Sequence, residues 1–88
     1  MTIFRLRDEK LRWLESNQEV IAFDEAGAAY FGANQTGSVL WHLLAGGSTR
    51  DDLVRALVDA FGVDEERAGT DVDAFLNQLQ EQGLLEQT

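Results

Sequence analysis

The chain has 88 residues and a mass of 9.8 kDa, and 44% of its residues are hydrophobic, 9% aromatic and 26% charged. This composition is typical of one small globular domain and excludes a disordered chain. Cysteine is absent, which excludes disulfides, thiolate metal sites and cysteine nucleophiles. No apolar run is long enough for a membrane span or a secretory signal, so we expect a cytoplasmic domain stabilised by packing alone.

The charge of the chain is strongly acidic and unevenly distributed. Sixteen acidic residues against seven basic ones give a net charge of −9. Residues 1–12 carry four bases and two acids, so the rest of the chain carries three bases and fourteen acids (3 − 14 = −11). Such a surface repels phosphate groups, which argues against nucleic acid and anionic membranes as partners and favours a basic or apolar partner.

The first third of the chain has the composition of β-strands. We expect an antiparallel three-stranded meander with strands over residues 10–15, 19–24 and 28–33. Ser16-Asn17-Gln18 predicts the first turn, and Asp24-Glu25-Ala26-Gly27 predicts the second. Residues 1–9 lie outside this pattern, and we interpret them as a flexible arm of the single domain that spans residues 1–88.

Three amphipathic helices are predicted after the strands. Asn34 is a favourable N-cap for the first helix, Ser48 or Thr49 for the second, and Asp64 for the third. Glycines end these helices, at Gly46-Gly47, Gly62 and Gly83.

The predicted order is β-β-β-α-α-α, and the helices cover one face of the sheet. This is a winged-helix-like α+β architecture. Leu84 and Leu85 follow the last helix and are expected to pack back on the core.

Groups for catalysis are missing. The only histidine, His42, is interpreted as a surface or rim residue, and Asp71 and Asp73 are spaced so that they point to different sides of a helix. There is no phosphate-binding glycine loop and no set of metal ligands. We therefore expect no enzymatic activity and no cofactor.

Two segments are candidates for binding a partner. The strand Ala28-Ala29-Tyr30-Phe31-Gly32 can present an edge to an added strand, because its small residues permit close backbone approach. The third predicted helix carries a stripe at spacings of three and four: Arg67, Asp71, Ala74, Phe75 and Gln78. From the residues alone, the alternative stays open that both segments are ordinary core and solvated surface.

The order of several short motifs resembles one known family. The aromatic pair Tyr30-Phe31 precedes Asn34 and the apolar-Trp pair Leu40-Trp41, as in that family, although the family usually has leucine where this chain has Ala33. The other matching segments are residues 43–49, 61–64, 71–76 and 83–85. The resemblance covers residues 10–85 and is to the PqqD-like family, whose members are recognition elements for ribosomally made, post-translationally modified peptides.

The resemblance implies a non-catalytic module that binds the leader segment of a precursor peptide as an added strand. Ala28 to Gly32 would pair with its main chain, and the stripe on the third helix would form the other wall. Phe75 would offer an apolar pocket, while Arg67 and Asp71 would select leader charges. The implied partners are the precursor and a modifying enzyme, such as a radical-SAM protein, a cyclase or a leader peptidase.

Two other functions compete with this interpretation. A winged-helix fold is compatible with a DNA-binding regulator, but residues 64–82 carry six acids and one base, which suits phosphate contacts poorly. A small structural subunit of an enzyme complex is the second alternative. The sequence leaves open which peptide class is served, whether pyrroloquinoline quinone, lasso or radical-SAM-modified.

Overall fold

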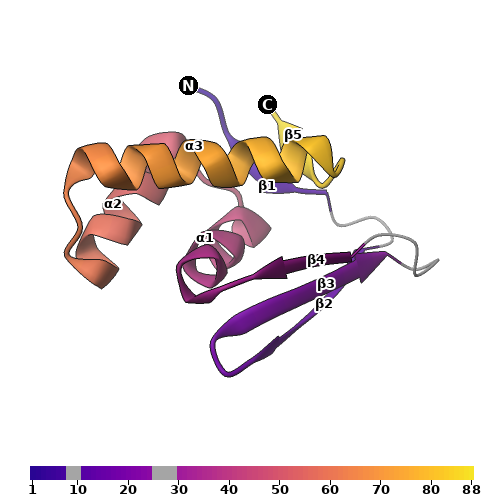
Figure 1. The fold of residues 1–88 in the computed structure, drawn as a ribbon. Coiled ribbons are helices and arrows are strands. Elements are labelled where there is room, and N and C mark those ends of the chain that lie inside the picture. The colour runs from indigo at the N-terminus through magenta and orange to yellow at the C-terminus, as the bar shows by residue number, and fades with distance from the viewer. Residues whose placement is uncertain (8–10, 25–29) are drawn as a thin grey trace.

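The computed structural model describes residues 1–7, 11–24 and 30–88. Figure 1 shows α1 between a sheet and the pair of helices α2 and α3, with both termini on the α3 side. The elements in chain order are β1 (Phe4–Leu6), β2 (Leu11–Ser16), β3 (Glu19–Asp24), β4 (Tyr30–Ala33), α1 (Gln35–Gly46), α2 (Arg50–Phe61), α3 (Glu65–Glu81) and β5 (Leu85–Gln87).

The predicted three-stranded antiparallel sheet is confirmed, with the strand order β2-β3-β4. Ser16 pairs with Glu19 across a two-residue turn in which Asn17 and Gln18 have φ angles of 54° and 64°. Two positive φ angles match the turn type whose twist suits a hairpin. The second predicted turn includes residues 25–27, which lie outside the described residues.

The amino terminus differs from the prediction of a flexible arm over residues 1–9. Residues 4–6 form β1, which pairs antiparallel with β5 in a second, two-stranded sheet. Leu6 is buried, and the Phe4 N–H donates to the Ser48 carbonyl while the Ser48 N–H donates to the Phe4 carbonyl, both at 2.8 Å. The arm prediction is therefore wrong for residues 4–6, because the partners of this strand lie at the far end of the sequence and after α1; residues 8 and 9 are not described.

The three helices begin at the predicted caps. The Asn34 side chain accepts from the Gly37 N–H at 3.0 Å, and the Asp64 side chain accepts from the Arg67 N–H at 2.7 Å. Between Ser48 and Thr49, the structure selects Thr49, whose Oγ1 accepts from the Asp52 N–H at 3.2 Å. Each cap satisfies one of the backbone donors that the first turn of a helix leaves without a partner.

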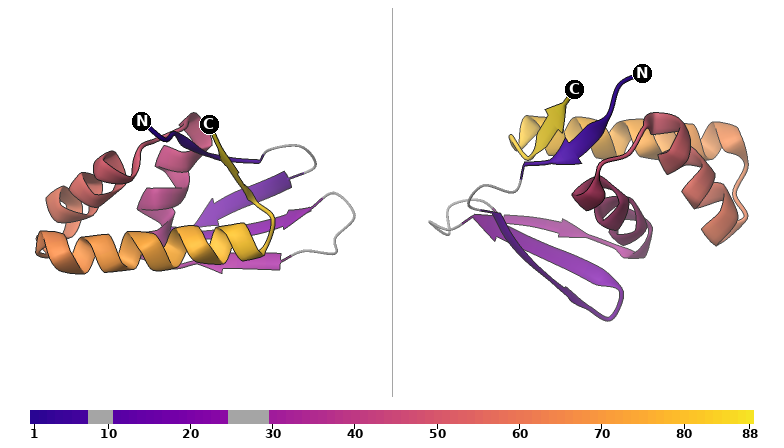
Figure 2. Two further views of the ribbon diagram at one scale, coloured as in Figure 1. Left: turned by 90° about the horizontal axis from the view of Figure 1, so that it is seen from above. Right: turned by 180° about the vertical axis from the view of Figure 1, so that it is seen from behind.

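The helices do not all cover the sheet as predicted. Among them, α1 makes the main contacts with β3 and β4, whereas α2 packs on α1 and α3 packs mainly on α2 and β5 (Figure 2). An amphipathic pattern shows which face of a helix is buried but not which element buries it. The expectation that three helices cover one face of the sheet is therefore wrong: α1 makes the main helical contacts with the sheet, and α3 comes near it at the end of β4.

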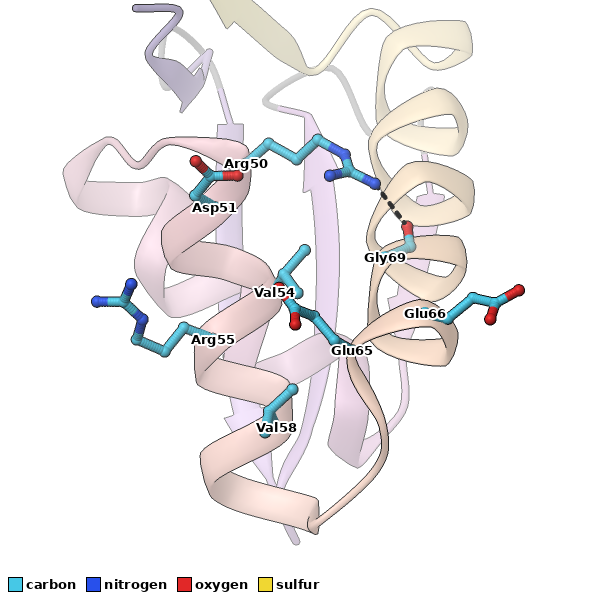
Figure 3. A pocket seen from close by; sticks show the side chains of 8 residues that line it. All are labelled: Arg50, Asp51, Val54, Arg55, Val58, Glu65, Glu66 and Gly69. Atoms are coloured by element: carbon cyan, nitrogen blue, oxygen red, sulfur yellow. Dashed lines mark hydrogen bonds between the residues drawn. The ribbon is translucent and has the colours of Figure 1, made fainter.

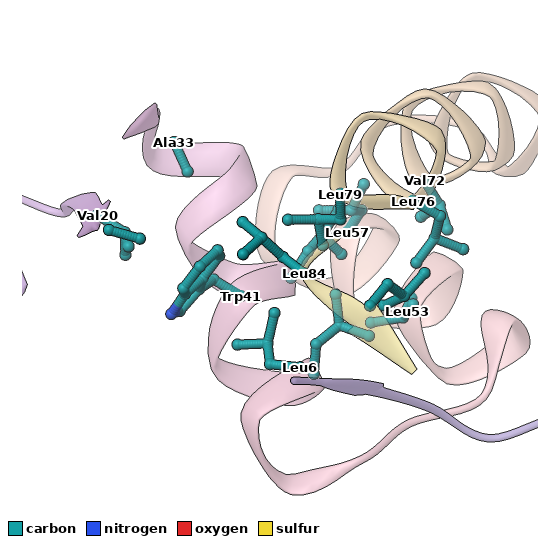
Figure 4. Close-up of a cluster of buried hydrophobic side chains, with 14 of the residues drawn as sticks. Leu6, Val20, Ala33, Trp41, Leu53, Leu57, Val72, Leu76, Leu79 and Leu84 are labelled. Atoms are coloured by element: carbon teal, nitrogen blue, oxygen red, sulfur yellow. The ribbon is translucent and has the colours of Figure 1, made fainter. Parts of the chain in front are cut away.

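The hydrophobic core has two parts on either side of α1. Trp41 is fully buried and lies toward Val20 and Ala33 of the sheet, and its ring meets that of Trp13 edge to face at 5.9 Å (Figure 4). Leucines of α2, α3 and the flanking segments gather on the other side. Leu84 and Leu85 belong to this cluster, as predicted. No helix in the described part of the chain is long and apolar enough to cross a membrane.

Candidate functional site

Among the described strands, both outer strands of the three-stranded sheet, β2 and β4, have an unpaired edge, and β4 is the one that was predicted to bind a partner. β4 pairs with β3 on one side, and no described strand pairs with its other side. The residues Tyr30, Phe31 and Gly32, expected to pair with a partner's main chain, lie in β4, whereas Ala28 and Ala29 fall outside the described residues. An unpaired strand edge presents backbone donors and acceptors to any extended chain.

The pairing register indicates which residues of β4 turn their backbone groups outward. Residues that flank a two-residue hairpin turn, here Ser16 and Glu19, exchange both of their hydrogen bonds, and the direction then alternates along the strand. Val20 and Ala22 consequently face β4, where they pair with Ala33 and Phe31. We therefore expect the N–H and C=O groups of Tyr30 and Gly32 to point to the open edge.

A groove of about 270 Å³ lies between the start of α1 and the middle of α3. It reaches the end of β4, because Asn34, the residue after that strand, is part of its lining. Its other lining residues are Thr36, Gly37 and Leu40 on the α1 side and Asp71, Ala74, Phe75 and Gln78 on the α3 side. The groove, which polar and apolar residues line together, thus begins where the strand with the open edge ends.

Four of the five helix residues predicted for the site line this groove together, and Arg67 does not. Arg67 lies one turn earlier on α3, where its backbone N–H donates to the Asp64 cap. The residues on the α1 side were not predicted, because Asn34 has a capping role and Leu40 a core role that explain their identity. The signal that could have indicated them is Gly37, a poor helix former in the first turn of a helix.

Two carboxylates near the groove differ in their surroundings: Asp71 lines the groove, whereas Asp73 is paired with Arg50. Among the described residues that line the groove, Asp71 alone is charged. Asp73 points to the other side of α3, where the Arg50 Nε donates to Oδ1 at 2.7 Å and Nη2 to Oδ2 at 3.0 Å. This hydrogen-bonded pair lowers the pKa of Asp73 and ties α3 to the start of α2.

A second polar contact ties the sheet to α1 at β2, the edge opposite β4. Glu15 Oε2 accepts a hydrogen bond from Ser38 Oγ at 2.9 Å and lies 3.0 Å from His42 Nε2. The contacts with His42 and then Ser38 lower the pKa of Glu15. His42 is exposed, as expected, and its role here is to hold β2 on α1.

The largest hollow, about 500 Å³, lies between α2 and α3 (Figure 3). Arg50 reaches across it toward the Gly69 carbonyl, and Val54 and Val58 supply its apolar wall, while Arg55 and Glu66 point away. No group of three or more His, Asp or Glu side chains in the described part of the chain is arranged to hold a metal ion. All residues that line this hollow belong to α2 and α3, so it lies apart from the open edge of β4 and is not the candidate site.

The fold of the chain is similar to that of two solved structures. The chain is similar to the structure described as "TbiB1 in Complex with the TbiA(beta) Leader Peptide", with a TM-score of 0.82, 28% identity, and coverage of 93% of this chain and 94% of that one. It also has the fold of "Lasso peptide synthetase B1 complexed with the leader peptide", with a TM-score of 0.79, 24% identity, and coverage of 94% and 96%.

No curated protein matches the sequence significantly. The family model described as coenzyme PQQ synthesis protein D (PqqD) matches residues 19–85, which include the sheet from β3 onward, all three helices and the start of β5. The chain therefore belongs to the PqqD family.

Proposed function

We propose that this protein binds the leader segment of a ribosomally made precursor peptide and presents it to a separate modifying enzyme. The observation that carries the proposal is the open edge of β4, which ends at the groove between α1 and α3. An extended peptide can pair with such an edge through main-chain hydrogen bonds, and pockets for alternate side chains then give specificity.

The groove has the chemistry of a specificity pocket. Phe75 and Leu40 supply apolar surface, while Asn34 and Gln78 supply hydrogen-bonding groups at its margin. Side chains of an added strand alternate between the two faces of the sheet, so every second leader residue would face α1 and α3. The two solved structures named above are complexes with a leader peptide, which supports the proposal that this chain binds a leader.

We further propose that the protein does no chemistry of its own. Its contribution is to raise the effective concentration of the precursor near the enzyme that modifies it. The enzyme is therefore a separate protein, and the acidic surface of this chain, with its net charge of −9, favours basic contact surfaces on its partners.

Fluorescence anisotropy with a labelled synthetic leader, taken from the precursor gene nearest to this gene, tests the proposal. We expect saturable binding, weakened at least tenfold by Phe75→Ala, which removes about 2 kcal/mol or more of apolar contact. The matched control is Phe61→Ala, the same change at an aromatic residue that is 38% exposed at the end of α2. Binding no tighter than about 100 μM to every nearby leader would contradict the proposal.

A second measurement separates strand addition from other ways of binding. N-methylation of one leader amide at a time removes one backbone donor and should weaken binding at every second position along the paired segment. Sensitivity without this alternation would indicate a different binding mode. A gel-shift assay with duplex DNA tests the regulator alternative, and we expect no shift because α3 carries five acids and one base.

A further inference from the structure

Gly32, in the edge strand β4, has no role in the fold that explains its identity. Its φ angle lies outside the left-handed region that favours glycine, and an added Cβ would meet no atom of the described residues within 4 Å. Glycine weakens strands, because it loses more backbone entropy than other residues and packs nothing. Glycine inside a strand often marks a bulge, a tight bend or a place where another molecule approaches closely. The pairing of β3 with β4 runs through Gly32 without interruption, which favours the close approach over a bulge.

Gly32 lies on the face of the sheet that points away from α1. Its direct neighbour on β3 is Ile21, and the neighbour of Ile21 on β2 is Leu14. These two apolar side chains are 36% and 58% exposed, whereas Val20 and Ala33, on the opposite face, are buried. On the outer face, the apolar side chains of Leu14 and Ile21 thus lie side by side on β2 and β3. The next position in this row, on the edge strand β4, is Gly32 and has no side chain.

A hollow of about 410 Å³ lies beside this position. It lies at the end of the sheet next to the first hairpin, and its lining residues are Ser16, Asn17, Glu19, Val20, Ile21, Gly32, Ala33 and Asn34. Ser16, Glu19, Ile21 and Gly32 belong to the outer face by the pairing register, whereas Val20 and Ala33 turn their side chains to the other face. It is distinct from the groove of Asp71 and Phe75, with which it shares only Asn34 and no residue of α3. The end of β4 therefore borders a depression to which outer-face residues contribute (the outer depression), in addition to the groove between α1 and α3.

We propose that the outer depression is a second specificity pocket, which takes a bulky apolar side chain of the leader. The inference rests on the proposed function and deepens it. A leader residue that faces Gly32 across the open edge shares its face of the sheet, so its side chain projects outward. The missing Cβ of Gly32 leaves room for that side chain to lie over β4 and reach Ile21.

The outer depression and the groove together would contact leader side chains on both faces of the sheet. The neighbours of the residue that faces Gly32 point to the helical face, where Phe75 lies, because side chains alternate along a strand. The leader segment that binds is therefore expected to carry a bulky apolar residue flanked by residues that fit the groove of α1 and α3. Cross-strand pairs of this kind stabilise a sheet when an apolar side chain covers apolar neighbours.

Substitution of Gly32 tests the inference without damage to the fold. Gly32→Val places a side chain at the depression, and because valine is favourable in strands and a Cβ at this position meets no described atom within 4 Å, the melting temperature should not fall. We expect the affinity for the labelled leader to fall at least tenfold with Gly32→Val and less with Gly32→Ala. The matched control is Gly46→Ala, at a position of α1 that is equally open and has no left-handed φ, and we expect it to leave the affinity unchanged.

An alanine scan of the leader identifies the residue that fills the pocket. With the unsubstituted protein, changing one bulky apolar residue of the leader to alanine should weaken binding. With the Gly32→Val variant, the same change in the leader should cause no further loss of affinity. The positions on either side should couple to Phe75→Ala instead. Equal affinity of Gly32→Val and the unsubstituted protein would overturn this inference and leave the proposed function standing, whereas no leader binding by the unsubstituted protein would overturn both.

Discussion

Gly37 on α1 and Phe75 on α3 lie so close that a Cβ atom at position 37 would be 3.0 Å from Cε1 of Phe75 and 3.0 Å from Cβ of Ala33. Three elements therefore meet at one residue without a side chain: the end of β4, the first turn of α1 and the middle of α3. This contact sets the width of the groove, because Gly37 and Phe75 both line it.

Gly37→Ala tests whether this close approach matters. Alanine normally stabilises a helix relative to glycine by about 1 kcal/mol, but overpacking costs about 1–3 kcal/mol. We expect a net loss of about 1 kcal/mol, or roughly 5 °C in melting temperature, together with weaker leader binding because Phe75 must move. Gly46→Ala, where the added Cβ meets no described atom, is the control and should not lower the melting temperature.

The amino-terminal strand provides a prediction about stability alone. Leu6 is 3% exposed and packs in the core, so Leu6→Ala should destabilise the protein by about 2–4 kcal/mol and lower the melting temperature by about 10 °C or more. Leu14→Ala is the same change at a residue that is 58% exposed and should cost under about 0.5 kcal/mol. Similar melting temperatures for both variants would restore the interpretation of residues 4–6 as a flexible arm.

The parts of the fold that could be predicted from the sequence are those with local causes. A cap side chain reaches a backbone N–H three residues away, so Asn34 and Asp64 mark helix starts that need no tertiary information. The pairing of β1 with β5 joins Leu6 to Leu85, and no local pattern reports a partner so far along the chain. The run Phe4-Arg5-Leu6 is too short and too charged to predict a strand by itself.

The candidate site likewise has one part that the sequence predicts and another that depends on tertiary structure. The spacing of Asp71, Ala74, Phe75 and Gln78 places them on one face of α3, which helical periodicity predicts. Which element faces them is a tertiary property, and this is why Thr36, Gly37 and Leu40 were missed. Arg67 shares the spacing but lies one turn nearer the start of α3 and is not part of the groove lining, so its role in selecting leader charges stays a prediction.

The carboxylate of Asp71 gives the groove a charge preference. Asp71 is the charged residue of the described groove lining, and the protein as a whole is acidic. We therefore expect the groove to favour a leader that places a basic residue next to Asp71. We expect Asp71→Asn to weaken leader binding about two- to fivefold in low salt, and the difference to vanish near 0.5 M salt, where charges on an exposed surface are screened. Asp59→Asn on α2, outside that lining, should have no effect.

The contact between Glu15 and α1 predicts a dependence of stability on pH. The hydrogen bonds from His42 and Ser38 lower the pKa of Glu15 in the folded state below its ordinary value of 4.5. A carboxylate with a lowered pKa stabilises the fold at pH values above its unfolded pKa, and this contribution is lost as the pH falls through the folded pKa. Glu15→Gln should therefore lower the melting temperature at pH 7, by a few degrees at most because both Glu15 and His42 are about half exposed.

Melting curves of the unsubstituted protein and Glu15→Gln between pH 7 and pH 2 measure this contribution. The difference between the two melting temperatures should stay constant from pH 7 until the pH approaches 4.5, the ordinary pKa of a glutamate side chain. It should then shrink at the lowest pH values, where Glu15 is protonated in the folded protein as well. Glu19→Gln, the same change at an exposed residue of β3, is the control. A difference that persists at pH 2 would show that the substitution acts through packing and not through the charge of Glu15.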